Sequence, residues 1–432
     1  MTTCVIEVND YELRLATRGE VLASSPGQAT LVDGRVEIGS AAMAVAWTHP
    51  RTSENRYWRD LNTAAIEHLG PRVRHHADLA WMQLEQLKSR GGNPAQVQFA
   101  VPGSMHTEQL SLLLGLADAT QLRTTALVDS AVAAGAGALG PGHWAHVDLQ
   151  QHQAVITRLD VNEQVSRGLV EVLPELGLNR LREACIRVIT QCFVSHCRFD
   201  PRHHADTEQI LQSQLDQWLG MLRQHHEIKL QLDYRGRRFD TRLTRSAIQD
   251  ALIPLLNPLR EALPAGATPV ASHRLAAQPG FSACFPGVAV LPEKAVFIGM
   301  ASLASASGTA QSLVVQLPAA RTPSVQVVIP ATAPVSDAPT HILDHDTARA
   351  IDHKPVYLLS RGGFARSAEA GGFCGVTRSA QGLELQPMTD ARVRVNGQTV
   401  NRPQRLVAGD QITLQGASVL YTAIRVQGPD AD

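Results

Sequence analysis

The spacing of hydrophobic and polar positions in the first third of the chain predicts alternating strands and helices. Residues 3–47 alternate short apolar runs with turn signals such as TRGE and VDGR, which predicts a strand meander. Residues 57–90 repeat apolar positions at helical spacing and predict one long helix. A buried strand at 96–103, a helix at 105–120 and a strand running into a helix at 122–139 follow. This alternation is typical of an α/β domain.

The middle of the chain continues with hairpins and helices. HVDLQQHQAVITRLDV, residues 146–161, predicts two strands joined by a tight turn that holds Gln150, Gln151 and His152. The predicted elements that follow are helices at about 175–199 and 206–226, a hairpin at 226–244 with Arg235 and Gly236 at its turn, a helix at 246–263 interrupted at Pro254 and Pro258, a strand and helix start at 267–281, and a helix at 293–308.

Residues 318–340 differ in composition from both flanking regions. They are rich in proline, alanine, serine and threonine and have little helical periodicity, so they predict a linker. Beyond them, short β-type runs separated by glycine and aspartate predict an all-β sandwich over 341–428. The expected organisation is therefore a domain at 1–317, a linker at 318–340 and a β-domain at 341–428.

Composition narrows the classes of partner and location. The 432 residues carry a formal net charge of -1, which does not favour nucleic acid or an anionic membrane surface as a partner. Since no apolar run approaches a membrane span and the N-terminus lacks a signal-peptide pattern, a cytoplasmic protein with reduced cysteines is expected. Cys185, Cys192 and Cys197 lie near three histidines, but they lack the close paired spacing of a zinc site, and we expect no metal.

The order of segments over residues 3–310 resembles the nucleotide-binding domain of the seventy-kilodalton heat-shock chaperones, in the actin-like ATPase superfamily. The segments that carry the resemblance are FAVPGSMHTEQLSLLLGLADATQLRTTALVDSAVAAG, DTEQILQSQLDQWLGMLRQHHEIKLQLDYRGRRFDTRLTRSAIQDAL, and PVASHRLAAQPG followed by EKAVFIGMASLAS. The resemblance implies a bilobal actin-like ATPase fold and a cleft for ATP and magnesium between the lobes.

The loops that hold phosphate in that family differ here. The family's DLGTT corresponds to EVNDY, residues 7–11, and its DLGGGT corresponds to DLQQHQ, residues 148–153. Glycine lets backbone N–H groups approach phosphate closely, and these loops have lost it. The resemblance leaves Asp148 and Gly177 as plausible matches. Asn9, Asp10 and His273 complete the candidate cleft.

The same comparison predicts a degraded base site. The helix that cradles ribose and adenine corresponds to DQWLGMLR, which leaves Asp216, Leu219, Gly220 and Arg223. We therefore expect no catalytic residues, no metal site and no nucleotide cofactor, with ATP and magnesium as the alternative. His152 and His273 could instead meet in the cleft as an acid–base pair, or serve only as packing or solvated polar residues.

The C-terminal stretch NGQTVNRPQRLVAGDQITLQG, residues 396–416, resembles a forkhead-associated (FHA) domain, in which Asn396 and Asn401 match the NG and VN positions. Such domains bind phosphothreonine with charged donors, and the resemblance places the serine–arginine pair at Ser360 and Arg361. Asp344 and His345 fall where the family has glycine and arginine. An aspartate there would repel phosphate, so we expect binding of a protein partner without phosphate.

These observations predict a non-catalytic, chaperone-like scaffold or adaptor that mediates protein–protein interaction, a pseudo-ATPase rather than an enzyme. The alternative is an ATP-binding molecular chaperone or actin-like ATPase with altered loops.

Overall fold

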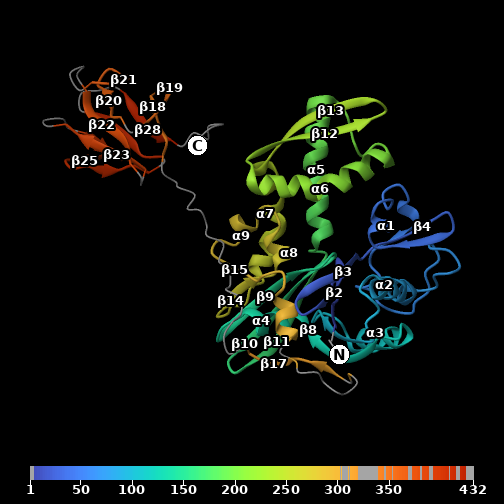
Figure 1. The fold of residues 1–432 in the computed structure, drawn as a ribbon. Helices are drawn as coiled ribbons and strands as arrows, with labels where there is room; N and C mark the ends of the chain where they lie inside the picture. The colour runs from blue at the N-terminus through green and yellow to red at the C-terminus, as the bar shows by residue number, and fades with distance from the viewer. Residues whose placement is uncertain are drawn as a thin grey trace. The chain divides into compact units, whose positions relative to one another are not determined.

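The computed structural model of the chain describes residues 4–301, 303, 310, 312–319, 339–344, 347–352, 354–367, 372–379, 382–388, 393–407, 409–414 and 419–424. The chain divides into two compact units, Met1–Pro330 and Ala331–Asp432. This division falls within the predicted linker 318–340, most of which lies outside the described residues. Helices and sheets are mixed along the chain, which confirms the predicted α/β class at that level (Figure 1).

The first unit contains two six-stranded sheets that repeat one arrangement. In the first sheet, the antiparallel meander β1–β2–β3 continues into the parallel strands β7 and β8. In the second, the antiparallel meander β9–β10–β11 lies beside the parallel strands β14 and β15. The strands are β1 (Cys4–Glu7), β2 (Glu12–Thr17), β3 (Glu20–Pro26), β7 (Gln96–Val101), β8 (Arg123–Asp129), β16 (Leu313–Val314), β9 (Gly142–Leu149), β10 (Gln153–Val161), β11 (Gln164–Pro174), β14 (Thr268–Ala271), β15 (Ala289–Val290) and β17 (Gln316–Pro318).

Helices cover these sheets, and two smaller sheets complete the unit. The smaller sheets are β4 (Ala29–Val32), β5 (Arg35–Ile38) and β6 (Ser53–Glu54), and the hairpin β12 (Glu227–Tyr234) and β13 (Arg237–Thr244). The helices are α1 (Ser40–Met43), the 3-10 helix η1 (Pro50–Thr52), α2 (His76–Arg90), α3 (Thr107–Ala119), α4 (Ser130–Ala138), α5 (Leu178–Cys197), α6 (Ala205–Gln224), α7 (Arg245–Glu261), α8 (His273–Ala276), α9 (Phe281–Cys284) and α10 (Ala295–Met300).

Helices α4 and α10 pack closely because each has a glycine at the contact. A Cβ on Gly299 would lie 1.7 Å from the carbonyl oxygen of Ala133, and one on Gly137 would lie 2.3 Å from that of Ala295. Helix α4 follows β8 and α10 follows β15, so the two helices occupy corresponding places after the two sheets. The close contact joins the two halves of the unit.

The predicted helix over 57–90 is wrong in its first half, since only α2 is helical. Residues 57–75 form turns, in which Gly70 has a φ of 76° and precedes Pro71. Tyr57 and Trp58 are buried, and each donates a hydrogen bond of 2.6 Å to the Gln83 side chain on α2. The apolar positions of this stretch therefore pack as anchors of a loop, which periodicity alone does not distinguish from a helix.

The prediction that Pro254 and Pro258 interrupt their helix is also wrong, because α7 continues through both. Each proline removes one backbone hydrogen bond and still leaves the rest of the helix paired. Ile248, Leu252 and Leu256 on the same helix are fully buried. Tertiary packing of this face outweighs the local preference.

The second unit forms two sheets around one core. One sheet has the order β19-β18-β28-β27-β24-β25 and the other β21-β20-β22-β23-β26. Buried residues that include Ile342, Leu358, Ile412 and Tyr421 fill the core. The strands are β18 (His341–Asp344), β19 (Thr347–Ala350), β20 (Val356–Leu359), β21 (Phe364–Ala365), β22 (Gly372–Ser379), β23 (Gly382–Pro387), β24 (Val393–Val395), β25 (Gln398–Val400), β26 (Gln404–Arg405), β27 (Gln411–Leu414) and β28 (Leu420–Ile424).

Within the described part of the chain, no helix is long and apolar enough to cross a membrane. The same residues contain no group of three histidine, cysteine or acidic side chains arranged to hold a metal ion. Cys185 is buried on α5, and Cys197 donates to the carbonyl of Asp240 at 2.8 Å.

Candidate functional site

The turns that follow β1 and β9 meet each other in the first unit, and they bring together Asn9, Asp10 and Asp148. The Asn9 amide donates to Asp148 Oδ2 at 3.1 Å and to the carbonyl oxygen of Leu149 at 3.3 Å. Asp10 Oδ1 accepts a hydrogen bond from the backbone N–H of Gln151. The three predicted cleft residues therefore bond the two turns to each other.

A buried ion-pair network lies beside these turns. Arg274, on α8, is 7% exposed and lies 2.9 Å from Glu7 Oε1 and 3.6 Å from Asp148 Oδ1. Arg14 forms a second ion pair with Glu7, its cross-strand neighbour between β1 and β2. Two guanidinium groups therefore neutralise the Glu7 and Asp148 carboxylates inside the protein.

The network reaches the segment before α10 through Arg14. Arg14 Nη1 donates to Glu293 Oε1 at 2.8 Å, and its guanidinium lies 5.1 Å from the centre of the Phe297 ring. One ion-pair network thus connects side chains from β1, β2, β9, α8 and the segment before α10. Such a network is sensitive to substitution, because removing one partner leaves a buried charge unpaired.

The charges of the network shift the titration of their neighbours. Burial alone would raise the pKa of Glu7, but the Arg274 and Arg14 guanidinium groups hold it at about 2. For His273, burial and then the positive charges of Arg274 and Arg14 lower the pKa to about 3. Glu7 is therefore ionised and His273 neutral at physiological pH.

The N-terminus of α5 is occupied by the turn between β9 and β10. The N–H groups of Leu178 and Asn179 donate to the carbonyls of Gln150 and Gln151, at 2.9 and 3.0 Å. Gly177 precedes this helix, and a Cβ on it would lie 2.4 Å from the Gln151 carbonyl oxygen. Gly177 thus permits backbone contact with the turn, and these first N–H groups of the helix already have acceptors.

Asp10 has one carboxylate oxygen in contact with protein donors and one without. Oδ2 is buried and has no hydrogen-bond partner among the described residues. Burial raises the pKa of Asp10 to about 7, against the opposing effect of the Gln151 and His152 N–H groups and with a further increase from Asp148. This carboxyl group therefore titrates near neutral pH.

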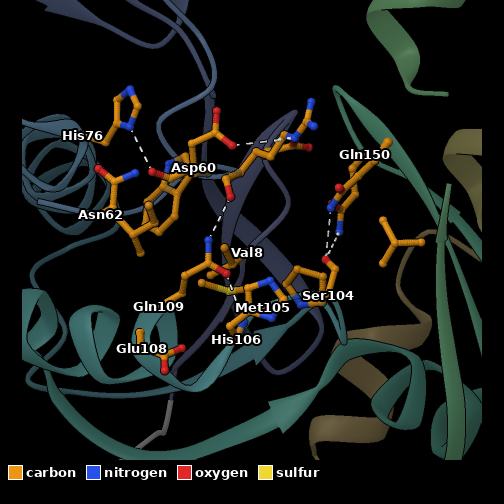
Figure 2. A pocket seen from close by; sticks show the side chains of 17 residues that line it. Val8, Asp60, Asn62, His76, Ser104, Met105, His106, Glu108, Gln109 and Gln150 are labelled. Carbon is orange, nitrogen blue, oxygen red and sulfur yellow. Dashed lines mark hydrogen bonds and ion pairs between the residues drawn. The ribbon is translucent and has the colours of Figure 1, made fainter. Parts of the chain in front are cut away.

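A cavity of about 710 Å³ opens on the side of these turns that faces α3 (Figure 2). Gln150 and Gln153 line it, and their amides donate to the Ser104 hydroxyl at 3.4 and 3.2 Å. Across the cavity, the His76 ring contacts the carbonyl oxygen of Asp60 at 2.9 Å. The lining combines polar, charged and apolar side chains, and Asp10 also contributes to it.

His152 and His273 do not form the acid–base pair that the sequence left open as one of two alternatives. His152 contacts the carbonyl oxygen of Asn55 at 3.1 Å, and burial lowers its pKa. His273 lies beside Glu7 and Arg274 instead. The two rings lie in different surroundings because the β9–β10 turn directs His152 toward the loop before Tyr57.

The residues expected at the base site do line one cavity, of about 240 Å³. Leu219, Gly220 and Arg223 from α6 form one wall, and His273 and Arg274 from α8 lie opposite. Asp216 also lines this cavity and forms an ion pair with Arg182. A pocket is therefore present here, and one of its lining residues, Arg274, also pairs with Asp148.

One glutamine on α6 connects this helix with the segment around α1. Gln209 accepts a hydrogen bond from the N–H of Trp47 at 2.9 Å and donates to the carbonyl oxygen of Met43 at 3.0 Å. These residues also line a third cavity, of about 560 Å³.

In the second unit, the predicted partner-binding residues lie in more than one loop. Ser360 is half-buried and Arg361 exposed in the turn after β20, and Asn396 and Asn401 are exposed. Asn396 bridges Asp410 and Gln411 through hydrogen bonds of 2.7 and 2.9 Å, so it shapes its own turn. His345 lies outside the described residues.

Asp344 is buried beside the loop that holds Ser360 and Arg361. Its Oδ2 accepts a hydrogen bond from the N–H of Gly363. The hydroxyl of Tyr421 donates to the carbonyl oxygen of Leu359 at 2.6 Å on the same loop. The Asp344 carboxylate thus binds a backbone N–H of this loop. It lies at the position where we expected a carboxylate to repel phosphate.

Sequence reasoning missed Glu7 as a paired group, and it missed Arg14 and Glu293 entirely. A signal was available, because Glu7 and Arg14 are charged positions within the apolar runs CVIEV and YELRLA. A charge buried in a strand needs a partner of opposite sign. Glu293 is distant in sequence, and only the fold brings it near Arg14.

Comparison of the sequence with protein-family models and with curated proteins gives no match.

Proposed function

We propose that this chain is a non-catalytic scaffold that mediates protein–protein interaction. It combines a bilobal actin-like ATPase fold, similar to the nucleotide-binding domain of the seventy-kilodalton heat-shock chaperones, with an FHA-like β-sandwich. The repeat of one arrangement in two six-stranded sheets supports the actin-like part of the proposal. The two sheets of the second unit support the sandwich.

One observation supports the proposed absence of ATPase activity. The Arg274 guanidinium lies between Glu7 and Asp148. The resemblance implies that Asp148 lies near metal-bound phosphates. Here a buried cation of the chain neutralises that carboxylate, and a divalent cation beside it would meet a like charge in a region of low dielectric constant. These residues therefore do not fit a bound magnesium ion.

The turn after β9 supports the same conclusion for phosphate. Its Gln151 N–H group donates to Asp10, and the first N–H groups of α5 donate to the turn itself. A triphosphate would need these donors, which acceptors of the protein already occupy. The cleft thus has side chains and backbone bonds of the protein in place of ligand contacts.

The alternative, an ATP-binding chaperone or actin-like ATPase, is favoured by the 240 Å³ cavity at the expected base site. Thermal unfolding with and without ATP and magnesium separates the two functions. A ligand at about 100 times its Kd adds about 2.7 kcal/mol, which would raise the Tm by about 5–10 °C. We expect no such rise and no ATP turnover.

ATP hydrolysis that is lost in Asp148→Asn would overturn the scaffold proposal. Asp118→Asn on the exposed face of α3 is the matched control, because it removes the same charge far from the turns.

For the second unit we propose binding of a protein partner that does not need phosphate. A dianion is costly to desolvate unless charged donors converge on it, and the buried Asp344 carboxylate opposes one. Titration of the protein with a phosphothreonine peptide library and its unphosphorylated counterpart tests this. A strong phosphate preference, abolished by Arg361→Ala, would show a conventional phosphothreonine reader instead.

A further inference from the structure

The hairpin β12–β13 packs against α5 and α6 (Figure 1). Near its turn lies a group of partly exposed aromatic rings. The rings of Phe199 and Phe239 stack with centroids 3.9 Å apart. The Tyr234 ring lies 6.3 Å from Phe199 and 5.4 Å from the His204 ring. We call these four rings, with the arginines described next, the aromatic tip.

Two exposed arginines belong to the tip. The guanidinium of Arg235 lies 5.1 Å from the centre of the Tyr234 ring, and that of Arg237 lies 5.4 Å from the centre of the Phe239 ring. Within the described chain, neither forms an ion pair with a carboxylate. A guanidinium that stacks on a ring keeps N–H donors available at its edge.

The other face of the same hairpin is different. Strand pairing places Arg237 opposite Tyr234 on the inward face, and Arg238 opposite Asp233 on the outward face. There, Arg238 pairs with Asp233 at 3.1 Å and Arg242 with Glu227 at 3.2 Å. The outward arginines are thus neutralised by the hairpin itself, and only the tip presents uncompensated positive charge over aromatic rings.

We propose that the aromatic tip is a docking site for an acidic segment of a partner protein. Arginine and aromatic residues are the types enriched at protein interfaces and at their energetic centres. Each guanidinium can form bidentate hydrogen bonds with a carboxylate, and the rings provide a rigid apolar surface beside it. The proposal does not depend on whether the cleft binds nucleotide.

Charge counts favour a protein over other anionic partners. DNA-binding proteins commonly neutralise about 6–10 phosphates, and membrane-binding segments carry about 4–8 basic residues. The tip has two uncompensated arginines, with the acidic Asp233 and Asp240 on the same hairpin. A short acidic segment matches two arginines, whereas a polyanion needs more basic partners than the tip offers.

Fluorescence anisotropy with a labelled oligo-glutamate peptide tests the proposal on the full chain at low ionic strength. We expect the peptide to bind, and an oligo-glutamine peptide of equal length not to bind. The double variant Arg235→Ser/Arg237→Ser should weaken binding about tenfold or more. The matched control Arg238→Ser/Arg242→Ser removes the same charge from the outward face, and its affinity should stay within about twofold of wild type.

Three results would overturn the proposal. They are absence of oligo-glutamate binding to the wild type, equal weakening by both double variants, and tighter binding of a single-stranded oligonucleotide than of the peptide. Thermal unfolding of both variants ensures that folded proteins are compared. Because all four arginines are exposed, both variants should fold.

Discussion

Replacing Asp10 by asparagine should stabilise the protein above neutral pH. Asp10 is 4% exposed, and one of its oxygens accepts the Gln151 N–H while the other has no hydrogen-bond partner among the described residues. Asparagine can keep the first contact through its own oxygen. It differs by carrying no charge at any pH.

The magnitude follows from the titration of this carboxyl group. Its pKa is about 7 in the folded protein, mainly because of burial, against an ordinary value of 3.8. Since each pKa unit corresponds to about 1.4 kcal/mol, ionising Asp10 in the folded state costs about 4 kcal/mol. A buried asparagine N–H group without a partner costs about 1–3 kcal/mol. Asp10→Asn should therefore gain about 1–3 kcal/mol at pH 8.

The direction with pH is fixed by the raised pKa. The folded state binds the proton more tightly than the unfolded state, so the stability that this proton contributes is fully present below pH 3.8 and is lost as pH rises to about 7. Near pH 4 the variant should accordingly be no more stable than wild type.

Urea unfolding of both proteins at several pH values from 4 to 8.5 provides the test, with Asp118→Asn as an exposed control. If the difference between Asp10→Asn and wild type is the same at every pH, the raised pKa and its assignment to burial are wrong. The control should show no pH-dependent gain.

Other predictions concern the backbone contact, the ion pairs and the second unit. Gly177→Ala should lower the free energy of unfolding by about 2 kcal/mol or more, since its Cβ would lie 2.4 Å from a backbone oxygen. Gly220→Ala, in α6 with only a side chain at 3.8 Å, should instead gain up to about 1 kcal/mol in the same urea unfolding. Arg274→Met should lose about 3–5 kcal/mol, and adding Asp148→Asn should recover part of it; a fully additive loss would refute the shared network. Peptide binding by the second unit should be independent of phosphorylation in the wild type and in Arg361→Ala alike, as measured by titration.

Much of the local structure of the first unit follows from the sequence. Strict apolar alternation and turn residues predict the hairpin of β12 and β13, and the tight turn at Gln150–His152 is likewise visible in the pattern. Periodicity failed at residues 57–75 and at the α7 prolines. There, long-range burial of Trp58 and Leu252 outweighed local preference.

For the candidate site, the sequence alone shows which loops lack glycine, whereas the grouping of Asn9, Asp10 and Asp148 rested on the resemblance. The structure places these three residues in two turns that hydrogen-bond to each other. Only the tertiary structure decided which charged side chains lie beside Glu7 and Asp148. Arg274 lies 267 residues from its partner Glu7, and no local pattern encodes that separation. Partner choice inside a protein depends on which strands and helices become neighbours, because a buried charge is stabilised by the nearest opposite charge in space rather than in sequence.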